Sequence, residues 1–187
     1  MASPEVTFGC SLGVEDYWDV AEFARRAEDL GFDRVTMGEH VMDGNPPRPT
    51  LLNIPALAAA AGATRRIRIM TGIVIAPLYH PVMLAKLAAS LDVVSNGRLD
   101  FGIGISGQRD TQIEFEALDI PVRTRGRRTD EIMQVLKRLW TEEHVSHQGR
   151  FFSFEDVTLL PQPVQKPYPP IWVAGRSDAA IDRKSVV

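Results

Sequence analysis

The order of predicted strands and helices constrains the fold of this chain more than any other feature of its sequence. Short apolar runs predict strands, and apolar residues spaced three and four positions apart predict the helices between them. The strands are expected at 6–10, 34–37, 67–76, 99–105 and 170–174, and the helices at 20–30, 54–63, 82–94, through 132–139 and from 177–178 onward. Because apolar strands alternate with helices, the sequence predicts an α/β protein whose parallel sheet is covered by helices.

Chain length bears on which parallel architecture this is. Five strand and helix units fit within the 187 residues. A complete barrel of eight units takes about 250 residues, whereas a doubly wound open sheet can be complete at this length. Length by itself therefore favours the open sheet.

The composition is that of an ordinary globular protein and argues against several kinds of partner. With 44% hydrophobic and 24% charged residues and a formal net charge of −3, the chain is not expected to bind nucleic acid or an anionic membrane. The four arginines between 123 and 128 precede an amphipathic helix and are expected to form a solvated face with carboxylate partners. Cys10 is the single cysteine, so neither a disulfide framework nor a metal site is predicted. The lack of a long apolar run and of a signal-like start predicts a cytoplasmic protein.

Residues 1–187 are expected to form one domain that contains an irregular excursion at 142–169. The strand and helix order lapses there, and Phe151–Phe154 is followed by five prolines. Because proline fixes the backbone, this segment is expected to be a stiff, extended connection rather than a recognition motif for a partner.

Glycine alternates with large apolar residues in the strand expected at 99–105. Side chains of a strand point to opposite faces in turn, so Gly102, Gly104 and Ser106 share one face and Phe101 and Ile103 share the other. A face without side chains lets a backbone or a flat ligand approach closely. The same residues spell G-x-G-x-x-G, but two of the glycines lie inside the strand and a polar loop is expected at 108–112. The dinucleotide-binding interpretation is therefore rejected.

Several motifs together resemble the bacterial luciferase-like monooxygenase family, and their wording is most similar to the branch that uses the deazaflavin coenzyme F-420. They occur in the order expected for that family and extend over nearly the whole chain. The motifs are Gly31–Val35 followed by Glu39 and His40, Tyr79–Pro81, Leu91–Ile105, Glu114–Leu118, Arg125–Glu131 and Pro169–Gly175. The resemblance implies a (β/α)8 barrel, which overrules the argument from length. The chain would then hold about five of the eight units, as the N-terminal part of a longer protein.

The resemblance also implies catalytic residues at the carboxyl end of the second strand. His40 would lie beside the reactive ring of the cofactor and handle a proton or charge, and the alternative is a loop histidine with a structural hydrogen bond. Glu39 would orient His40 or contact the substrate, and the alternative is a solvated acidic residue. Gly72 and Ile73 would form a cis peptide that supports the back of the ring, whereas a strand glycine can also be a compromise of barrel packing.

Further cofactor contacts are implied on two other segments. Gly102, Gly104 and Ser106 would face the barrel interior and leave room for the ring, although the family often has tryptophan where Ser106 stands. The turn Gly175, Arg176, Ser177 would hold a phosphate of the cofactor, and the alternative is an ordinary capped helix start. Two weaker candidates are Asn53 and His80, of which His80 precedes a helix and is at least as well suited to capping it.

The function expected from these observations is hydride transfer between coenzyme F-420 and a small organic substrate. The first alternative is an FMN-dependent monooxygenase that uses reduced flavin and O2. An alternative of another class is a truncated, non-catalytic fragment, because the last parallel strands would have exposed edges that invite association. For the full-length protein a homo-oligomer, a dimer, is expected.

Overall fold

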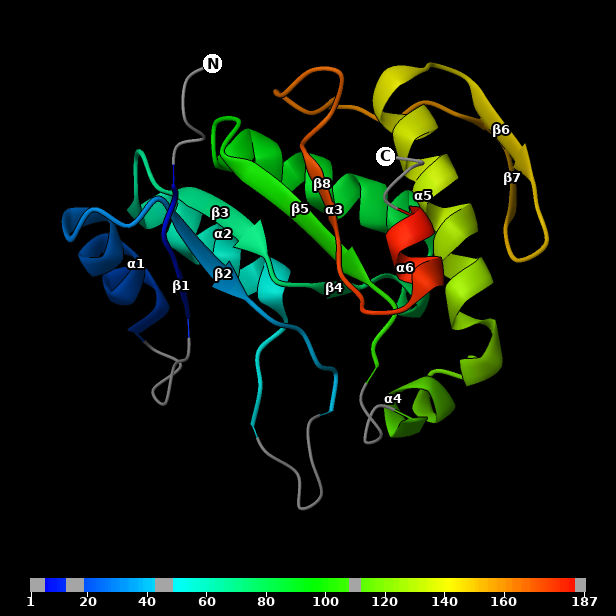
Figure 1. Ribbon diagram of the computed structural model, residues 1–187. Coiled ribbons are helices and arrows are strands. Elements are labelled where there is room, and N and C mark those ends of the chain that lie inside the picture. Colours follow the sequence, from blue (N-terminus) through cyan, green and yellow to red (C-terminus); the bar gives the residue numbers. More distant parts are fainter. Residues whose placement is uncertain (1–5, 13–18, 43–48, 108–111, 184–187) are drawn as a thin grey trace.

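A parallel sheet forms the centre of the computed structural model, which describes residues 6–12, 19–42, 49–107 and 112–183 (Figure 1). Neighbouring strands are paired in the order β1, β2, β3 and β5, and both β4 and β8 pair with β5. All of these pairs are parallel. The strands are β1 (Gly9–Ser11), β2 (Arg34–Met37), β3 (Arg68–Thr71), β4 (Val74–Ile75), β5 (Leu99–Gly104) and β8 (Ile171–Val173).

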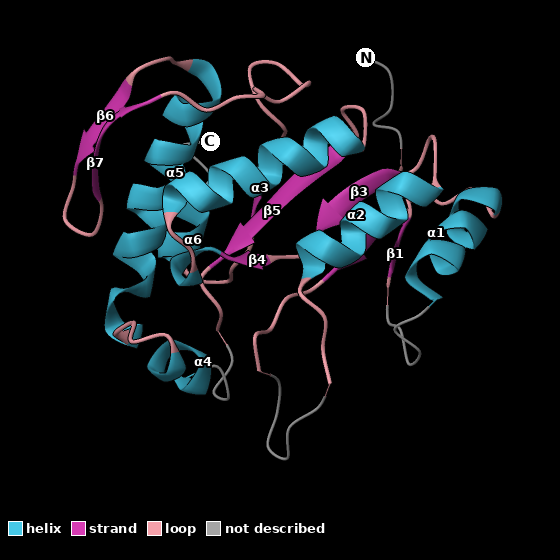
Figure 2. Ribbon diagram, turned by 180° about the vertical axis from the view of Figure 1, so that it is seen from behind, coloured by secondary structure: helices cyan, strands magenta, loops and turns pink. Residues whose placement is uncertain are grey.

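The larger helices lie together on one face of this sheet (Figures 1 and 2). Each contacts the next in chain order, so they form a continuous layer. They are α1 (Val20–Asp29), α2 (Asn53–Ala63), α3 (Pro81–Val94) and α5 (Arg125–Thr141). A doubly wound sheet carries helices on both faces, whereas a barrel wall carries them on the outside only. The architecture is therefore that of a barrel wall, against the argument from length, and the eight-unit count stays a prediction.

The core lies between the sheet and this helix layer. Val35, Ile69 and Phe101 are completely buried there, as the alternation along their strands requires. Phe101 packs edge-to-face on Trp140 of α5, with 5.8 Å between the ring centroids. The indole N–H of Trp140 donates to the carbonyl of Ala85, 3.0 Å away, so its polar atom is satisfied inside the core.

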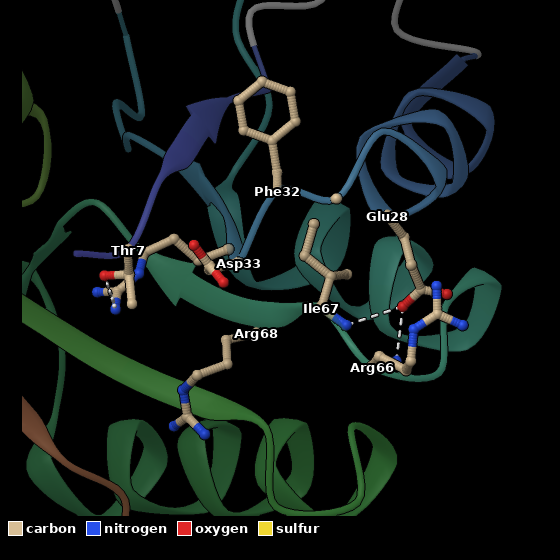
Figure 3. A pocket seen from close by; sticks show the side chains of 9 residues that line it. Thr7, Glu28, Phe32, Asp33, Arg66, Ile67 and Arg68 are labelled. Atoms are coloured by element: carbon tan, nitrogen blue, oxygen red, sulfur yellow. Dashed lines mark hydrogen bonds between the residues drawn. The ribbon is translucent and has the colours of Figure 1, made fainter. Parts of the chain in front are cut away.

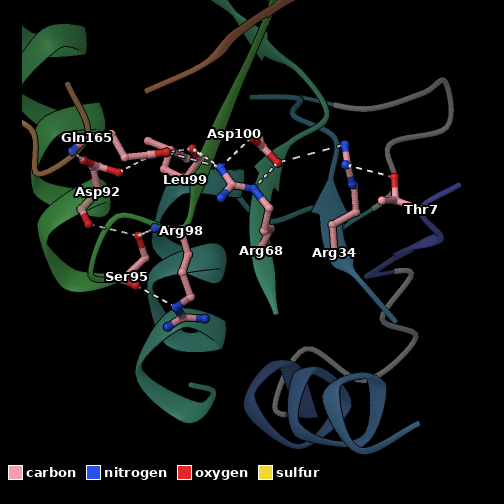
Figure 4. A network of polar contacts seen from close by, with 9 residues as sticks. All are labelled: Thr7, Arg34, Arg68, Asp92, Ser95, Arg98, Leu99, Asp100 and Gln165. Atoms are coloured by element: carbon pink, nitrogen blue, oxygen red, sulfur yellow. Dashed lines mark hydrogen bonds and ion pairs between the residues drawn. The ribbon is translucent and has the colours of Figure 1, made fainter. Parts of the chain in front are cut away.

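The turn between α3 and β5 holds the end of α2 in place (Figure 4). Asn96 and Gly97 have φ angles of 55° and 74°, a left-handed conformation that reverses the chain after a helix. Arg98 then donates through its guanidinium to the carbonyls of Ala61 and Thr64 at the end of α2. These carbonyls have no partner within the helix, so Arg98 satisfies groups that would otherwise be left without a hydrogen bond.

The opposite face of the sheet is charged. Arg68 makes two hydrogen bonds with the carboxylate of Asp100, at 2.7 and 2.8 Å, and Arg34 lies 4.0 Å from the same carboxylate (Figure 4). The guanidinium of Arg34 also lies over the ring of Trp172, 5.4 Å from its centroid. This face therefore carries paired polar groups and a partly exposed aromatic side chain.

Two predicted strands differ from those in the structure. The first strand is shorter and later than 6–10, and Val6 is 73% exposed rather than paired. The strand expected at 67–76 divides into β3, β4 and the 3-10 helix η2 (Ala76–Leu78), where Pro77 lacks the N–H that a strand would need. The polar loop at 108–112 lies outside the described residues up to 111, and Gln112 begins the unpredicted helix α4 (Gln112–Ala117).

The excursion at 142–169 is also more regular than predicted. It contains an antiparallel pair, β6 (Val145–Gln148) and β7 (Ser153–Val157), that is separate from the main sheet. The proline-rich connection then leads into β8, and the helix α6 (Asp178–Arg183) follows. The 3-10 helix η4 (Val122–Thr124) precedes α5. Across the described residues, no helix combines the length and hydrophobicity that a membrane crossing needs.

Candidate functional site

A cavity of about 230 Å³ opens at the carboxyl ends of β2, β3 and β5. In β/α barrels this edge of the sheet carries the active site. The cavity brings together five of the residues singled out from the sequence, namely Glu39, His40, Gly72, Ile73 and Ser106. Gly38, Ile75 and Gly107 complete its lining.

His40 is held by a carboxylate that the sequence did not single out. Its Nδ1 lies 3.3 Å from Oε2 of Glu114, and its side chain is 21% exposed at the cavity. Glu114 belongs to α4 and is fully buried. Its other oxygen accepts the backbone N–H groups of Val41, at 2.5 Å, and Met42, at 3.1 Å. Glu114 thus anchors both the imidazole and the loop that carries it.

Glu39 is buried beside His40, but its hydrogen bonds go elsewhere. One oxygen accepts the hydroxyl of Tyr79 at 2.7 Å, and the other accepts the N–H of Ile75 at 2.8 Å. Burial raises the pKa of Glu39, and these two donors oppose the rise. Burial and the neighbouring carboxylate raise the pKa of Tyr79, which keeps its hydroxyl a donor. The carboxylate that contacts His40 is therefore that of Glu114, while Glu39 ties the loop after β2 to β4.

The Gly72–Ile73 peptide is cis, as the resemblance implied. Asn53 at the start of α2 fixes this segment, because its side-chain amide donates to the carbonyls of Ile73, at 3.1 Å, and Met37, at 3.4 Å. The N–H of Gly72 donates to the same Met37 carbonyl at 2.7 Å. Asn53 was only a weak candidate from the sequence, and the structure assigns it a structural role against the cavity wall.

The glycines of β5 accommodate protein atoms rather than an open space. A Cβ on Gly102 would lie 2.0 Å from the carbonyl oxygen of Thr71, and a Cβ on Gly104 would lie 2.8 Å from Cδ1 of Ile73. Of the two reasons for a bare strand face, close approach of a backbone is the one that the structure shows at Gly102. The expectation that these two glycines leave room for a ring is thus wrong in its physical reason, since Thr71 and Ile73 fill that room.

Ser106 reaches the cavity by a different route from the one that strand alternation suggested. β5 ends at Gly104, and Ser106 has a φ of 57°, so the alternation of faces no longer applies to it. It nevertheless lines the cavity.

The remaining candidates lie outside this cavity. Gly175, Arg176 and Ser177 form an exposed turn between β8 and α6, where the Ser177 hydroxyl accepts the Ala180 N–H at 3.3 Å as a helix cap. His80 caps α3, since its Nδ1 accepts the Val82 N–H at 3.3 Å. Burial, together with nearby positive charge, lowers the pKa of His80. The capping interpretation of His80 is confirmed.

A larger cavity of about 410 Å³ lies near the amino ends of β2 and β3 (Figure 3). Its carboxylates accept hydrogen bonds from backbone N–H groups. Glu28 accepts the N–H groups of Arg65, Arg66 and Ile67, and Asp33 accepts the N–H of Phe8. None of the candidate catalytic or cofactor-binding residues from the sequence lines this cavity. It is therefore a weaker candidate for a functional site than the cavity at His40.

Sequence reasoning missed Glu114 and Tyr79 as parts of the site. Both lie in motifs that carried the family resemblance, so the resemblance already included these two positions. Their partners are distant in the sequence, since Glu114 contacts a residue 74 positions away and Tyr79 one that is 40 positions away. The only signal in the sequence was that both residues stand in these motifs, since the burial of Glu114 is known from the structure alone.

Comparisons with known proteins identify a family and a fold for the chain. Residues 3–184 match the family model described as luciferase-like monooxygenase. The chain is 37% identical over 161 residues to the oxygenase component of the flavin-dependent trigonelline monooxygenase of Acinetobacter baylyi, a match that covers 86% of this chain and 43% of that protein. It is 28% identical to the F-420-dependent glucose-6-phosphate dehydrogenase of Microbacterium testaceum, over 92% of this chain and 52% of that protein.

A solved structure gives the same result for the fold. The crystal structure of the monooxygenase RslO1 from Streptomyces bottropensis matches with a TM-score of 0.78 and 36% identity, over 89% of this chain and 52% of that chain. The chain thus spans about half the length of the relatives that it matches.

Proposed function

The chain belongs to the luciferase-like monooxygenase family, and from that premise we propose that the complete protein is an oxidoreductase in which coenzyme F-420 exchanges hydride with a small organic substrate at the His40 cavity. The observation that carries the proposal is the convergence of His40, Gly72, Ile73 and Ser106 in one cavity at the carboxyl edge of the sheet. Relatives in this family include both F-420-dependent and flavin-dependent enzymes.

The cavity wall suits the edge of a flat ring. Gly38, Gly72 and Gly107 line it, and a Cβ on Gly107 would meet no atom within 4 Å, whereas a Cβ on Gly72 would lie 2.0 Å from Oγ1 of Thr36. The volume of about 230 Å³ lies below the roughly 300 to 1,000 Å³ of sites that enclose a whole small ligand. In the proposed complex this cavity receives one part of the cofactor, with Gly72 and Ile73 behind the ring.

The cofactor supplies a ring carbon that accepts or donates a hydride. When an alcohol is oxidised, its C–H electron pair leaves as hydride and its hydroxyl proton needs an acceptor. His40 is placed to take that proton, because imidazole is the side chain that titrates near neutral pH. Glu39 and Asn53 contribute by holding the cavity walls, since their hydrogen bonds go to Ile75, Tyr79, Ile73 and Met37.

Monooxygenation with reduced FMN and O2 is the second candidate function, and identity to relatives favours it. The flavin-dependent trigonelline monooxygenase is 37% identical, against 28% for the F-420-dependent dehydrogenase.

In either case we propose that a phosphate of the cofactor lies near Gly175, Arg176 and Ser177. The support is that this turn is exposed and leads into α6. It also follows directly after Ala174, whose Cβ lies near Gly104 of β5.

The two functions differ in the cofactor that the purified full-length protein retains. Titration with F-420 and with FMN, followed by the fluorescence of each cofactor, is expected to show binding of F-420. His40→Ala is expected to lower the rate of hydride transfer by about 100-fold or more. His144→Ala is the matched control and should not change it, because His144 is an exposed histidine just before β6.

Other outcomes would redirect the assignment. Retention of FMN with no affinity for F-420 would replace hydride transfer by the monooxygenase. Binding of neither cofactor, by the full-length protein and by the 187-residue chain alike, would support the non-catalytic alternative. Sedimentation of the same samples tests the proposed dimer.

A further inference from the structure

Glu114 is a buried carboxylate whose two oxygens divide their partners. Oε1 accepts two backbone N–H groups, from Val41 and Met42, and Oε2 faces Nδ1 of His40. An ionised carboxylate accepts hydrogen bonds and donates none. Because Glu114 has no exposed surface, a partner for Oε2 matters to the stability of the buried charge.

This contact has a consequence for the chemistry of His40. In a neutral imidazole one nitrogen carries the proton and the other accepts, and the hydrogen bond made by one nitrogen decides which is which. A carboxylate opposite Nδ1 requires Nδ1–H. The lone pair is then on Nε2, the nitrogen left to serve the cavity.

We propose that Glu114 is a positioning residue that fixes the Nδ1–H tautomer of His40 and so presents the Nε2 lone pair to the cavity as a proton acceptor. This inference rests on the proposed function only in assigning proton transfer to His40. The tautomer itself is a property of the chain and needs neither cofactor nor substrate.

Glu114→Gln separates positioning from loop anchoring. The variant has nearly the same volume but only one acceptor oxygen, and the two backbone N–H groups of Val41 and Met42 require that oxygen. The amide NH2 then faces His40, so Nδ1 must accept and the proton moves to Nε2. If Glu114 served only to anchor the loop, the substitution would change the stability of the protein without changing the tautomer of His40.

The experiment is 15N NMR of the His40 imidazole in the 187-residue chain, at a pH above the ordinary imidazole pKa near 6.5. The expected result is the Nδ1–H tautomer in the wild type, favoured by about tenfold or more as a charge-assisted hydrogen bond allows. Glu114→Gln is expected to reverse the preference. Glu116→Gln is the matched control, because Glu116 is exposed on the same helix and bonds Gln112 instead.

Two results overturn the proposal. One is an Nε2–H tautomer in the wild type, a result that does not depend on whether any variant folds. The other is a folded Glu114→Gln variant in which Nδ1–H is retained. A separate measurement tests the proposed function: protection of His40 from carbethoxylation by F-420 or FMN in the full-length protein. Protection without a tautomer change would refute only the role of Glu114, and a tautomer change without protection would refute only the cofactor site.

Discussion

Substitution of Gly102 by alanine tests the account of the glycine strand most directly. The new Cβ would lie 2.0 Å from the Thr71 carbonyl oxygen and 3.1 Å from its carbonyl carbon. Both atoms belong to the backbone of a buried strand, so β3 and β5 must move apart. This displaces the hydrogen bond from the Thr71 hydroxyl to the Gly102 carbonyl, at 2.8 Å. Overpacking costs about 1 to 3 kcal/mol and a lost hydrogen bond about 1 kcal/mol, so the expected loss is about 3 kcal/mol.

Two other glycines provide matched comparisons. Alanine at Gly104 would meet Cδ1 of Ile73 at 2.8 Å, the free end of a side chain that can change rotamer, and about 1 kcal/mol is expected. Alanine at Gly62 in α2 would meet nothing within 4 Å, and a gain of about 0.5 to 1 kcal/mol is expected from helix propensity.

Urea unfolding followed by tryptophan fluorescence measures all three variants of the same chain. The midpoint should fall most for Gly102→Ala, less for Gly104→Ala, and rise for Gly62→Ala, with similar slopes. A loss of about 3 kcal/mol is a large share of the stability of an ordinary domain. If Gly102→Ala were no less stable than Gly104→Ala, the claim that Gly102 is needed because the Thr71 backbone packs against it would be refuted.

Two further predictions concern polar contacts away from the cavity. Arg98→Met removes the donors that cap α2 at Ala61 and Thr64 and should lower the free energy of unfolding by about 3 kcal/mol in the same urea assay, whereas the exposed Arg66→Met should change it little. The hydrogen bond that His144 donates to the Asp156 carboxylate raises the pKa of His144, so the contribution of this pair to stability is present at low pH and lost as the pH rises through that pKa. Asp156→Asn should lower the pKa of His144 in an NMR titration while Glu155→Gln leaves it higher, and equal values in both variants would contradict the assignment.

The periodic elements were predictable because local patterns determine them. β2 has the predicted bounds of 34–37, and α3 begins one residue before the predicted start at 82. In both, burial follows the spacing of apolar residues, and Pro81 at the first turn marks where α3 begins. Helix placement on one face was not predictable from these patterns, since doubly wound and barrel sheets have the same order of strands and helices.

The interrupted strand and the His40 contact could not be read from local patterns. The chain from 67 to 76 is mostly apolar and has no strong break signal before Pro77, so its division depends on contacts with Asn53 in α2 and Glu39 after β2. The partner of His40 comes from a helix 74 positions later in the chain. Sequence spacing ranks Glu39 as the natural partner of its neighbour His40, yet the structure turns the Glu39 carboxylate toward Tyr79 and Ile75.

The glycines of β5 and the wall of the cavity depend on each other. Gly102 admits the Thr71 carbonyl, and Gly104 admits the side chain of Ile73, which lines the cavity. A side chain at either position would displace the Gly72–Ile73 segment and so change the wall behind the proposed ring without contacting the ring itself. The glycines of β5 therefore affect the shape of the cavity indirectly, through the neighbouring Gly72–Ile73 segment. This explains how a bare strand face can belong to a binding site while its own glycines are buried beneath the surface.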